Sequence, residues 1–269
     1  MKLGNLAARV VTSAVLVPGL ILAINWRRPE AVWAIVFAAT LAALHEYFTI
    51  SLDEAVERWF GIVLGAALAA GIYWRPEAYA VALPAAVVLP ALFFLFRFRT
   101  LETVWPRLGM TAFGVIYAGV LLTFLALAKR DGGAHGGDWL YLILMTGWFG
   151  DTGAYFAGRA FGRTKLYPAI SPGKTWAGAV GGLAGSFGGA ALANLWFFPE
   201  LGWVHGAVLT VVGGALGQCG DLVESMWKRA RGVKDSGRLL PGHGGMLDRV
   251  DAVIFIAPWV VLYRELVWR

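Results

Sequence analysis

Residues 252–263 read AVIFIAPWVVLY and carry no charge, yet they directly follow the polar stretch KDSGRLLPGHGGMLDRVD at 234–251. The polar stretch holds basic side chains, a histidine, four glycines and three acids. A bilayer or a deep core accepts the apolar run, because burying apolar surface is favourable and no charge opposes it. The junction therefore predicts a membrane helix that begins at a charged loop.

The composition of the whole chain indicates the same environment. Hydrophobic residues make up 58% of the 269 residues and charged residues 15%, against roughly 45–50% and about 25% in an ordinary soluble domain. We therefore expect one membrane domain over 1–269. The single cysteine, Cys219, excludes an internal disulfide and any multi-cysteine metal site.

Repeated apolar segments approach the roughly 20 residues that a helix needs to cross the hydrocarbon. They lie at 7–25, 31–50, 59–74, 79–96, 109–128, 138–157, 176–198, 203–227 and 250–267. The sequence thus predicts an all-α, polytopic membrane protein with about nine transmembrane helices. We expect 1–130 to be mainly scaffold and 138–255 to form a catalytic half that carries the site loops.

The distribution of basic residues predicts the orientation. With the N-terminus inside, the 23 lysines and arginines divide more than two to one in favour of the inner side. The positive-inside rule then places the N-terminus and residues 234–251 in the cytoplasm, at the cell (inner) membrane. The basic charge needs no nucleic-acid partner, because more than half of the inside cations lie in the loops after the sixth and eighth spans.

The predicted spans carry acids at depth, where a charge costs roughly 2.5–3.5 kcal/mol on insertion scales, and two of them stand out. They are Asp151 in TGWFGDTGAYFAG and Asp221 in ALGQCGDLVESMWKR. Such a cost implies a partner. For Asp151 alone, a structural ion pair and a functional role are equally supported.

Helical spacing gathers further polar side chains around Asp221. Its helix face also carries Glu224, Ser225 and Lys228. By the same spacing, Asp248 and Asp251 share a face of the next helix. Carboxylates without a histidine or thiol cluster suit Mg²⁺ rather than zinc, so we expect Asp221, Asp248 and Asp251 to bind one Mg²⁺ or a pair of cations.

The basic residues around these acids suit phosphate oxygens. They are Lys228, Arg229, Lys234, Arg238 and Arg249. A solvated surface that attracts anionic headgroups explains the cations equally well, but it explains neither the acids nor the glycines. The stretch AGAVGGLAGSFGGAALA at 177–193 has small residues at helical spacing and predicts close helix packing.

The stretch SMWKRARGVKDSGRLLPGHGGMLDRVD at 225–251 resembles the signature of the phosphatidate cytidylyltransferases, the CDP-diacylglycerol synthases. The matching positions are Ser225, Lys228, Arg229, Lys234, Asp235, Pro241, His243, Gly244, Gly245, Asp248, Arg249 and Asp251. Upstream, DTGAYFAGRAFGRTKLYPAISPGKTW resembles a second block of the family, although many members carry lysine at the position of Gly173 and an acid or amide at that of Ala177. The resemblance covers 150–255.

The resemblance implies an Mg²⁺-dependent nucleotidyltransferase that condenses CTP with phosphatidic acid into CDP-diacylglycerol and pyrophosphate. Its substrates meet where a charged loop joins an apolar span, and a homodimer is one assembly to test. The resemblance implies catalytic roles for Asp221, Asp248, Lys228 and Arg229. It implies substrate contacts for Ser171, Lys174, Thr175, Ser225, Lys234, His243, Gly244, Gly245 and Arg249.

Two other functional classes fit the sequence less well. A transporter would place acids at broken helices, but related halves and midplane sites are not evident. A CDP-alcohol phosphotransferase would require a spaced Asp-Gly-x-x-Ala-Arg motif, which is missing. Neither class accounts for the block at 225–251.

Overall fold

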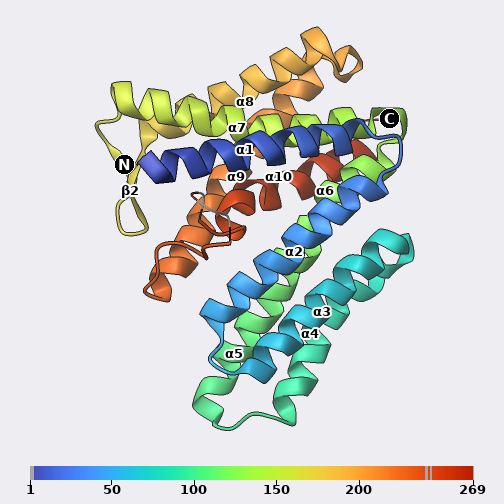
Figure 1. The fold of residues 1–269 in the computed structure, drawn as a ribbon, viewed down its shortest axis with the longest axis vertical. Coiled ribbons are helices and arrows are strands. Elements are labelled where there is room, and N and C mark those ends of the chain that lie inside the picture. The colour runs from blue at the N-terminus through green and yellow to red at the C-terminus, as the bar shows by residue number, and fades with distance from the viewer. Residues whose placement is uncertain (1–2, 240–241, 243, 269) are drawn as a thin grey trace. The chain divides into compact units, whose positions relative to one another are not determined.

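The computed structural model describes residues 3–239, 242 and 244–268. Within them the chain is almost entirely helical (Figure 1). The long helices are α1 (Leu3–Asn25), α2 (Glu30–Ser51), α3 (Ala55–Trp74), α4 (Tyr79–Leu95), α5 (Leu101–Gly114), α6 (Leu122–Asp131), α7 (Gly136–Phe161), α8 (Trp176–Trp196), α9 (Trp203–Ala230) and α10 (Leu247–Leu266). Each apolar segment of the prediction coincides with helix.

The predicted segment 109–128 is more elaborate than a single α-helix. A π-helical turn, η2 (Val115–Leu121), joins α5 to α6. Short 3-10 turns connect other helices, namely η1 (Pro76–Ala78), η3 (Gly133–His135) and η4 (Pro199–Leu201).

The all-α prediction missed one small sheet. Strands β1 (Lys165–Tyr167) and β2 (Ser171–Thr175) form an antiparallel hairpin between α7 and α8. Lys165 pairs with Thr175, and Tyr167 pairs with Ser171. The hairpin lies outside the apolar segments, so hydropathy could not reveal it.

Within the part of the chain that the structure describes, four helical segments are long and apolar enough to cross a membrane. They are Glu30–Ser51, Ala55–Trp74, Leu101–Asp131 and Trp203–Ala230. The segments Thr12–Asn25 of α1 and Tyr79–Leu95 of α4 are apolar but shorter. These helices support a membrane protein, while nine crossings and a cytoplasmic N-terminus stay predictions.

The chain forms two compact units. The first contains Met1–Ala126 and Asp235–Arg249, and the second contains Leu127–Lys234 and Val250–Arg269. The described residues of 235–249, which include the start of α10, thus belong to the first unit, and the division into a scaffold (1–130) and a catalytic half (138–255) stays a prediction.

Helices α2, α3 and η2 form the centre of the first unit. Gly61 and Gly65 of α3 leave room for the side chains of Phe48 and Leu44. Phe48 and Leu44 are fully buried. A side chain at either glycine would occupy the space of these core residues, so the glycines set the distance between α2 and α3.

In the second unit, small residues bring α7 and α8 into backbone contact, as the sequence predicted. A Cβ atom at Gly185 would collide with the carbonyl of Phe149, and one at Gly181 would collide with Ala157. Helices α9 and α10 also approach closely, because Gly220 lies against the backbone of Asp251. That approach places Asp221 and Asp251 on adjoining helices.

Candidate functional site

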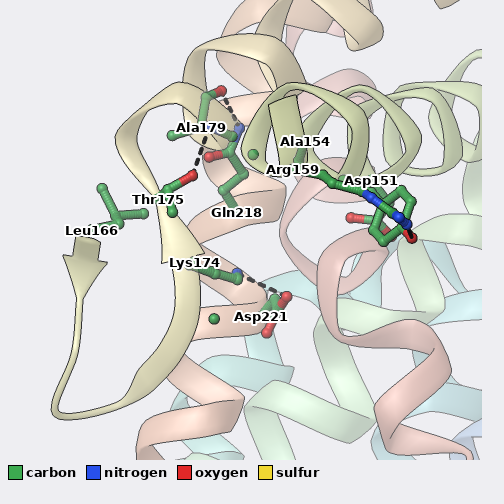
Figure 2. Close-up of a pocket in the computed structure, with 13 residues that line it drawn as sticks. Asp151, Ala154, Arg159, Leu166, Lys174, Thr175, Ala179, Gln218 and Asp221 are labelled. Carbon is green, nitrogen blue, oxygen red and sulfur yellow. Dashed lines mark hydrogen bonds and ion pairs between the residues drawn. The ribbon is translucent and has the colours of Figure 1, made fainter. Parts of the chain in front are cut away.

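The second unit contains a pocket of about 420 Å³ (Figure 2). Helices α7 and α9, the hairpin and the first turn of α8 contribute to its wall. Its lining consists of Asp151, Ala154, Tyr155, Gly158, Arg159, Leu166, Gly173, Lys174, Thr175, Gly178, Ala179, Gln218 and Asp221. Asp151 and Asp221, the two span acids that the sequence made prominent, therefore line one pocket.

An ion pair crosses this pocket. Lys174 Nζ on β2 lies 2.8 Å from Asp221 Oδ2 on α9, and Figure 2 shows the two side chains pointing toward each other. Ser225, one turn along α9, donates its hydroxyl to Asp221 Oδ1 at 3.3 Å. Two of the predicted substrate-contacting residues, Lys174 and Ser225, thus contact Asp221.

Thr175 and Ser171 occupy the two ends of β2. Thr175 is buried and caps α8, because its Oγ1 accepts the amide proton of Gly178 at 3.1 Å. Cβ atoms at Gly158 and Gly162 would contact or clash with this hydroxyl. Ser171 lies opposite Tyr167, outside the pocket lining. Lys174 and Thr175 therefore line the pocket and Ser171 does not, and substrate contact stays a prediction for all three.

Helix α7 adds residues that the sequence analysis did not assign. Arg159 donates from Nη1 to the hydroxyl of Tyr155 at 3.0 Å, and both line the pocket with Asp151. From α9, Gln218 donates its amide to the carbonyl of Ala179 at 3.0 Å. The sequence gives the helical spacing of Tyr155, Arg159 and Gln218, but only the fold shows that the helix faces that carry them border the pocket.

Two acids of the second unit lie on adjoining helices. Asp221 is on α9, and Asp251 is on α10, where its backbone carbonyl lies against Gly220. Among the described residues, no group of three or more His, Cys, Asp and Glu side chains is arranged to hold a metal ion. Mg²⁺ commonly uses one or two carboxylates and completes its shell with water and substrate phosphates. Asp221 and Asp251 fit that pattern by donor chemistry.

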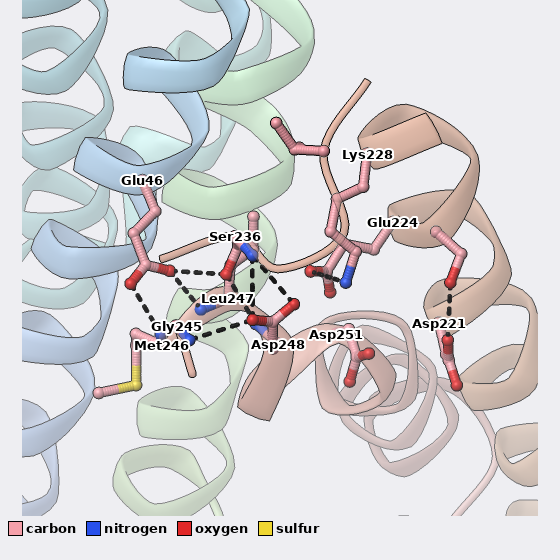
Figure 3. A network of polar contacts seen from close by, with 12 residues as sticks. Glu46, Asp221, Glu224, Lys228, Ser236, Gly245, Met246, Leu247, Asp248 and Asp251 are labelled. Carbon is pink, nitrogen blue, oxygen red and sulfur yellow. Dashed lines mark hydrogen bonds and ion pairs between the residues drawn. The ribbon is translucent and has the colours of Figure 1, made fainter. Parts of the chain in front are cut away.

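Lys228 is buried in α9 and forms an ion pair. Its Nζ lies 3.0 Å from Oε1 of Glu224, whose side chain is also buried (Figure 3). A buried cation needs such a partner, because desolvation without compensation is costly. Helical spacing in the sequence placed Glu224 and Lys228 on one face of α9, but it did not predict the ion pair between them.

The other predicted cations lie at the surface. Arg229 is exposed and donates from Nη1 to the carbonyl of Val233 at 3.0 Å. Lys234 and Arg249 are also exposed. His243 lies outside the described residues.

In the first unit, Asp248 at the start of α10 binds the signature loop, by which we mean the described residues between Asp235 and Met246. Its Oδ2 accepts the amide protons of Ser236 and Gly245, each at 3.0 Å. Gly244 has a φ of +84°, a conformation that favours glycine. The predicted ligand Asp248 thus already serves as a backbone acceptor.

Glu46 of α2 is the principal residue that sequence reasoning missed. It is 6% exposed, and its carboxylate accepts bonds from the loop at Ser236, Met246 and Leu247 (Figure 3). The available signal was an acid in the mostly apolar segment 31–50, where a charge is costly.

Comparisons with known proteins agree with the resemblance noted above. The model of the cytidylyltransferase family matches residues 7–267. The phosphatidate cytidylyltransferase of Brucella suis is 44% identical over 156 residues, which cover 58% of this chain and 57% of that protein. The Staphylococcus aureus enzyme of the same name is 46% identical over 146 residues, 54% of each chain. The Haemophilus influenzae enzyme is 43% identical over 129 residues, 46% of this chain and 45% of its own. The matched part thus spans about half the length of these relatives.

Proposed function

Because the chain belongs to the cytidylyltransferase family, we propose that it transfers the cytidylyl group of CTP to phosphatidic acid. The products are CDP-diacylglycerol and pyrophosphate, in phospholipid biosynthesis. The names of the matching relatives support this choice of substrates.

The observation that carries the proposal is the Lys174–Asp221 pair in the pocket of the second unit. A carboxylate and an ammonium side by side suit a metal–phosphate substrate, because each can exchange its partner for an ion of the substrate. Arg159 adds a second cation to the same lining. Apolar helices of the same protein would give the lipid substrate its access.

The reaction requires positioning more than acid–base chemistry. An oxygen of the phosphatidate phosphate attacks the α-phosphorus of CTP in line, and the bond from that phosphorus to the bridging oxygen breaks, so that pyrophosphate leaves with the electron pair. A phosphate monoester is already an anion near neutral pH, and no strong general base is needed. The residues must orient two anions and offset their charge.

Cations of the chain take that role in the proposal. Lys174 and Arg159 would hold CTP phosphates from the pocket wall, and Lys228 and Arg229 would contribute from the end of α9. Lys234 and Arg249, which are exposed, are the further phosphate contacts that the sequence predicts. Lys228 would be oriented by its ion pair with Glu224.

Magnesium belongs to the proposal as the cofactor. Asp221 and Asp251 would hold it with substrate oxygens, and Asp248 is the further ligand that the sequence predicts. A bound Mg²⁺ supplies charge neutralisation at the phosphoryl oxygens.

The proposed location is the inner membrane, with the N-terminus and the site on the cytoplasmic side, where CTP is available. The excess of basic residues in the inner loops supports this orientation.

An assay with purified protein tests the activity. Labelled CTP and phosphatidate in detergent micelles should yield labelled CDP-diacylglycerol with Mg²⁺ and none with a chelator. A protein that is monodisperse by size-exclusion chromatography but gives no lipid-linked label at any Mg²⁺ concentration would contradict the proposal. The same chromatography distinguishes a monomer from a homodimer.

A further inference from the structure

We propose that Glu46 is a positioning residue that holds the described residues of the signature loop, together with the start of α10, in their working shape. The importance of this role for catalysis rests on the proposed function. The structural part of the role does not, because it follows from contacts inside the first unit.

The carboxylate of Glu46 is bound at three points, all on residues about 190 to 200 positions later in the chain. Oε1 accepts the amide proton of Met246 at 2.9 Å. Oε2 accepts the amide proton of Leu247 and the hydroxyl proton of Ser236, each at 2.9 Å. Leu247 is the first residue of α10, so the carboxylate binds amides that a helix start leaves without partners.

The backbone of the loop is shaped around this carboxylate. A Cβ atom at Gly237 would collide with Oε1 of Glu46, and one at Gly245 would collide with Oε2 and with Ser236 Oγ. Gly245 is buried. Gly245, for which the family resemblance implies substrate contact, therefore has a second role, which is to leave room for the carboxylate of Glu46.

Ser236 connects Glu46 to Asp248. Its hydroxyl donates to Glu46 and accepts the amide proton of Asp248 at 3.3 Å. Its own amide donates to Asp248 Oδ2 at 3.0 Å. Figure 3 shows the resulting chain of contacts from α2 to the first turn of α10. A change at Glu46 should therefore alter the orientation of Asp248, a predicted ligand.

The geometry requires a carboxylate rather than an amide. Each oxygen of Glu46 accepts at least one backbone N–H. Glutamine has one carbonyl oxygen and one NH₂ group, so in either orientation its NH₂ group would face an amide donor. Such a contact breaks at least one bond and leaves a buried donor unsatisfied. Aspartate keeps two acceptors and should restore part of the effect.

Hydrogen exchange tests the contacts without reference to activity. In the full-length protein in detergent, amides in the peptide covering 244–248 should exchange at least tenfold faster in Glu46→Gln than in wild type. Glu46→Asp should lie between the two. The matched control is Glu54→Gln, which removes another acid of the first unit, one that pairs with Arg99, and should leave this peptide unchanged.

Kinetics test the consequence. We expect Glu46→Gln to lower kcat at least tenfold while KM for CTP changes less than threefold, and Glu46→Asp to recover part of kcat. A general loss of folding would lower the active fraction and would not be rescued by aspartate. Ser236→Ala removes one link and serves as the second variant if Glu46→Gln fails to fold. It should accelerate exchange of the same peptide.

The outcomes separate the two proposals. Unchanged exchange at 244–248 in Glu46→Gln, or in Ser236→Ala if the first does not fold, would overturn the positioning role. Faster exchange with wild-type kcat would overturn its catalytic importance. Faster exchange in a protein whose wild type does not consume CTP would overturn the proposed function and leave the loop contact established.

Discussion

The ammonium of Lys174 lies 2.8 Å from the carboxylate of Asp221. This ion pair joins the hairpin after α7 to the C-terminal half of α9. The two residues are 47 positions apart in sequence and share one pocket. Both side chains remain partly exposed, at 25% and 35%. A substrate from water can therefore reach the pair, and the pair is the first target for mutation.

Replacing Asp221 with asparagine should abolish most of the activity. The change keeps the size of the side chain but removes the charge that faces Lys174 and that we assign to Mg²⁺. We expect kcat/KM to fall at least a hundredfold, or about 2.7 kcal/mol of transition-state stabilisation, with membrane insertion unchanged. Asp138→Asn is the matched control, because Asp138 pairs with His135 outside the pocket lining. Turnover like wild type in Asp221→Asn at saturating Mg²⁺ would remove Asp221 from the proposal.

Exchanging Arg229 for lysine should separate phosphate binding from attraction to a lipid surface. Arg229→Lys preserves the charge but not the shape of the side chain. An anionic headgroup surface would attract lysine and arginine equally, so activity would not change if attraction to lipid were the only role of Arg229. A planar guanidinium that contacts phosphate and the carbonyl of Val233 cannot be copied by an ammonium. We expect at least a tenfold loss in kcat/KM, about 1.4 kcal/mol, measured with each substrate varied separately. Arg75→Lys, another exposed arginine, provides the control, and a silent Arg229→Lys would argue for surface attraction.

A lysine at position 173 should be tolerated. Gly173 lines the pocket, and a Cβ atom there would meet nothing within 4 Å. Gly173→Lys would introduce the residue that many members of the resembled family carry and would add a cation beside Lys174. We expect an unchanged melting temperature and a KM for CTP at or below that of wild type. Gly173→Glu, of similar length and opposite charge, should raise KM, and equal effects of both variants would exclude an electrostatic contribution at this position.

Adding one methyl group between α7 and α8 should destabilise the second unit. A Cβ atom at Gly181 would collide with that of Ala157, and overpacking of this kind costs about 1–3 kcal/mol. Gly181→Ala should lower the melting temperature in detergent by several degrees. Gly188→Ala is the control on the same helix and should leave the melting temperature unchanged, because a Cβ atom at Gly188 would lie in open space. A Gly181→Ala protein that melts at the same temperature as Gly188→Ala would contradict the close packing.

Accessibility of single cysteines should establish the orientation. After Cys219→Ser, a cysteine at Arg99 or Arg238 should be shielded from an impermeant thiol reagent added outside intact cells. A cysteine at Ala134 should react. All three positions are exposed in the structure, so burial does not confound the result. The reverse pattern would place residues 234–251 outside and separate them from cytoplasmic CTP.

The position and length of the apolar runs in the sequence were enough to predict where the helices of this protein lie. An apolar run of about 20 residues satisfies its own backbone hydrogen bonds only as a helix, whatever surrounds it, so the predicted segments and the observed helices agree. The same local rule placed Asp221, Glu224, Ser225 and Lys228 on one face of α9. The small-residue stretch at 177–193 likewise predicted close packing, because contact between helices depends on side-chain size that the sequence displays.

Tertiary structure decided which polar groups meet. The hairpin that carries Lys174 is held by pairing between short segments with no apolar pattern of their own, so hydropathy gave no signal for it. Glu46 appeared in the sequence as an acid in a mostly apolar segment, and its partners are backbone amides about 200 positions away. Amide donors exist at every non-proline residue, and only the fold selects Met246 and Leu247 from among them. For that reason the sequence could indicate the chemistry of the signature loop but not the carboxylate that holds it.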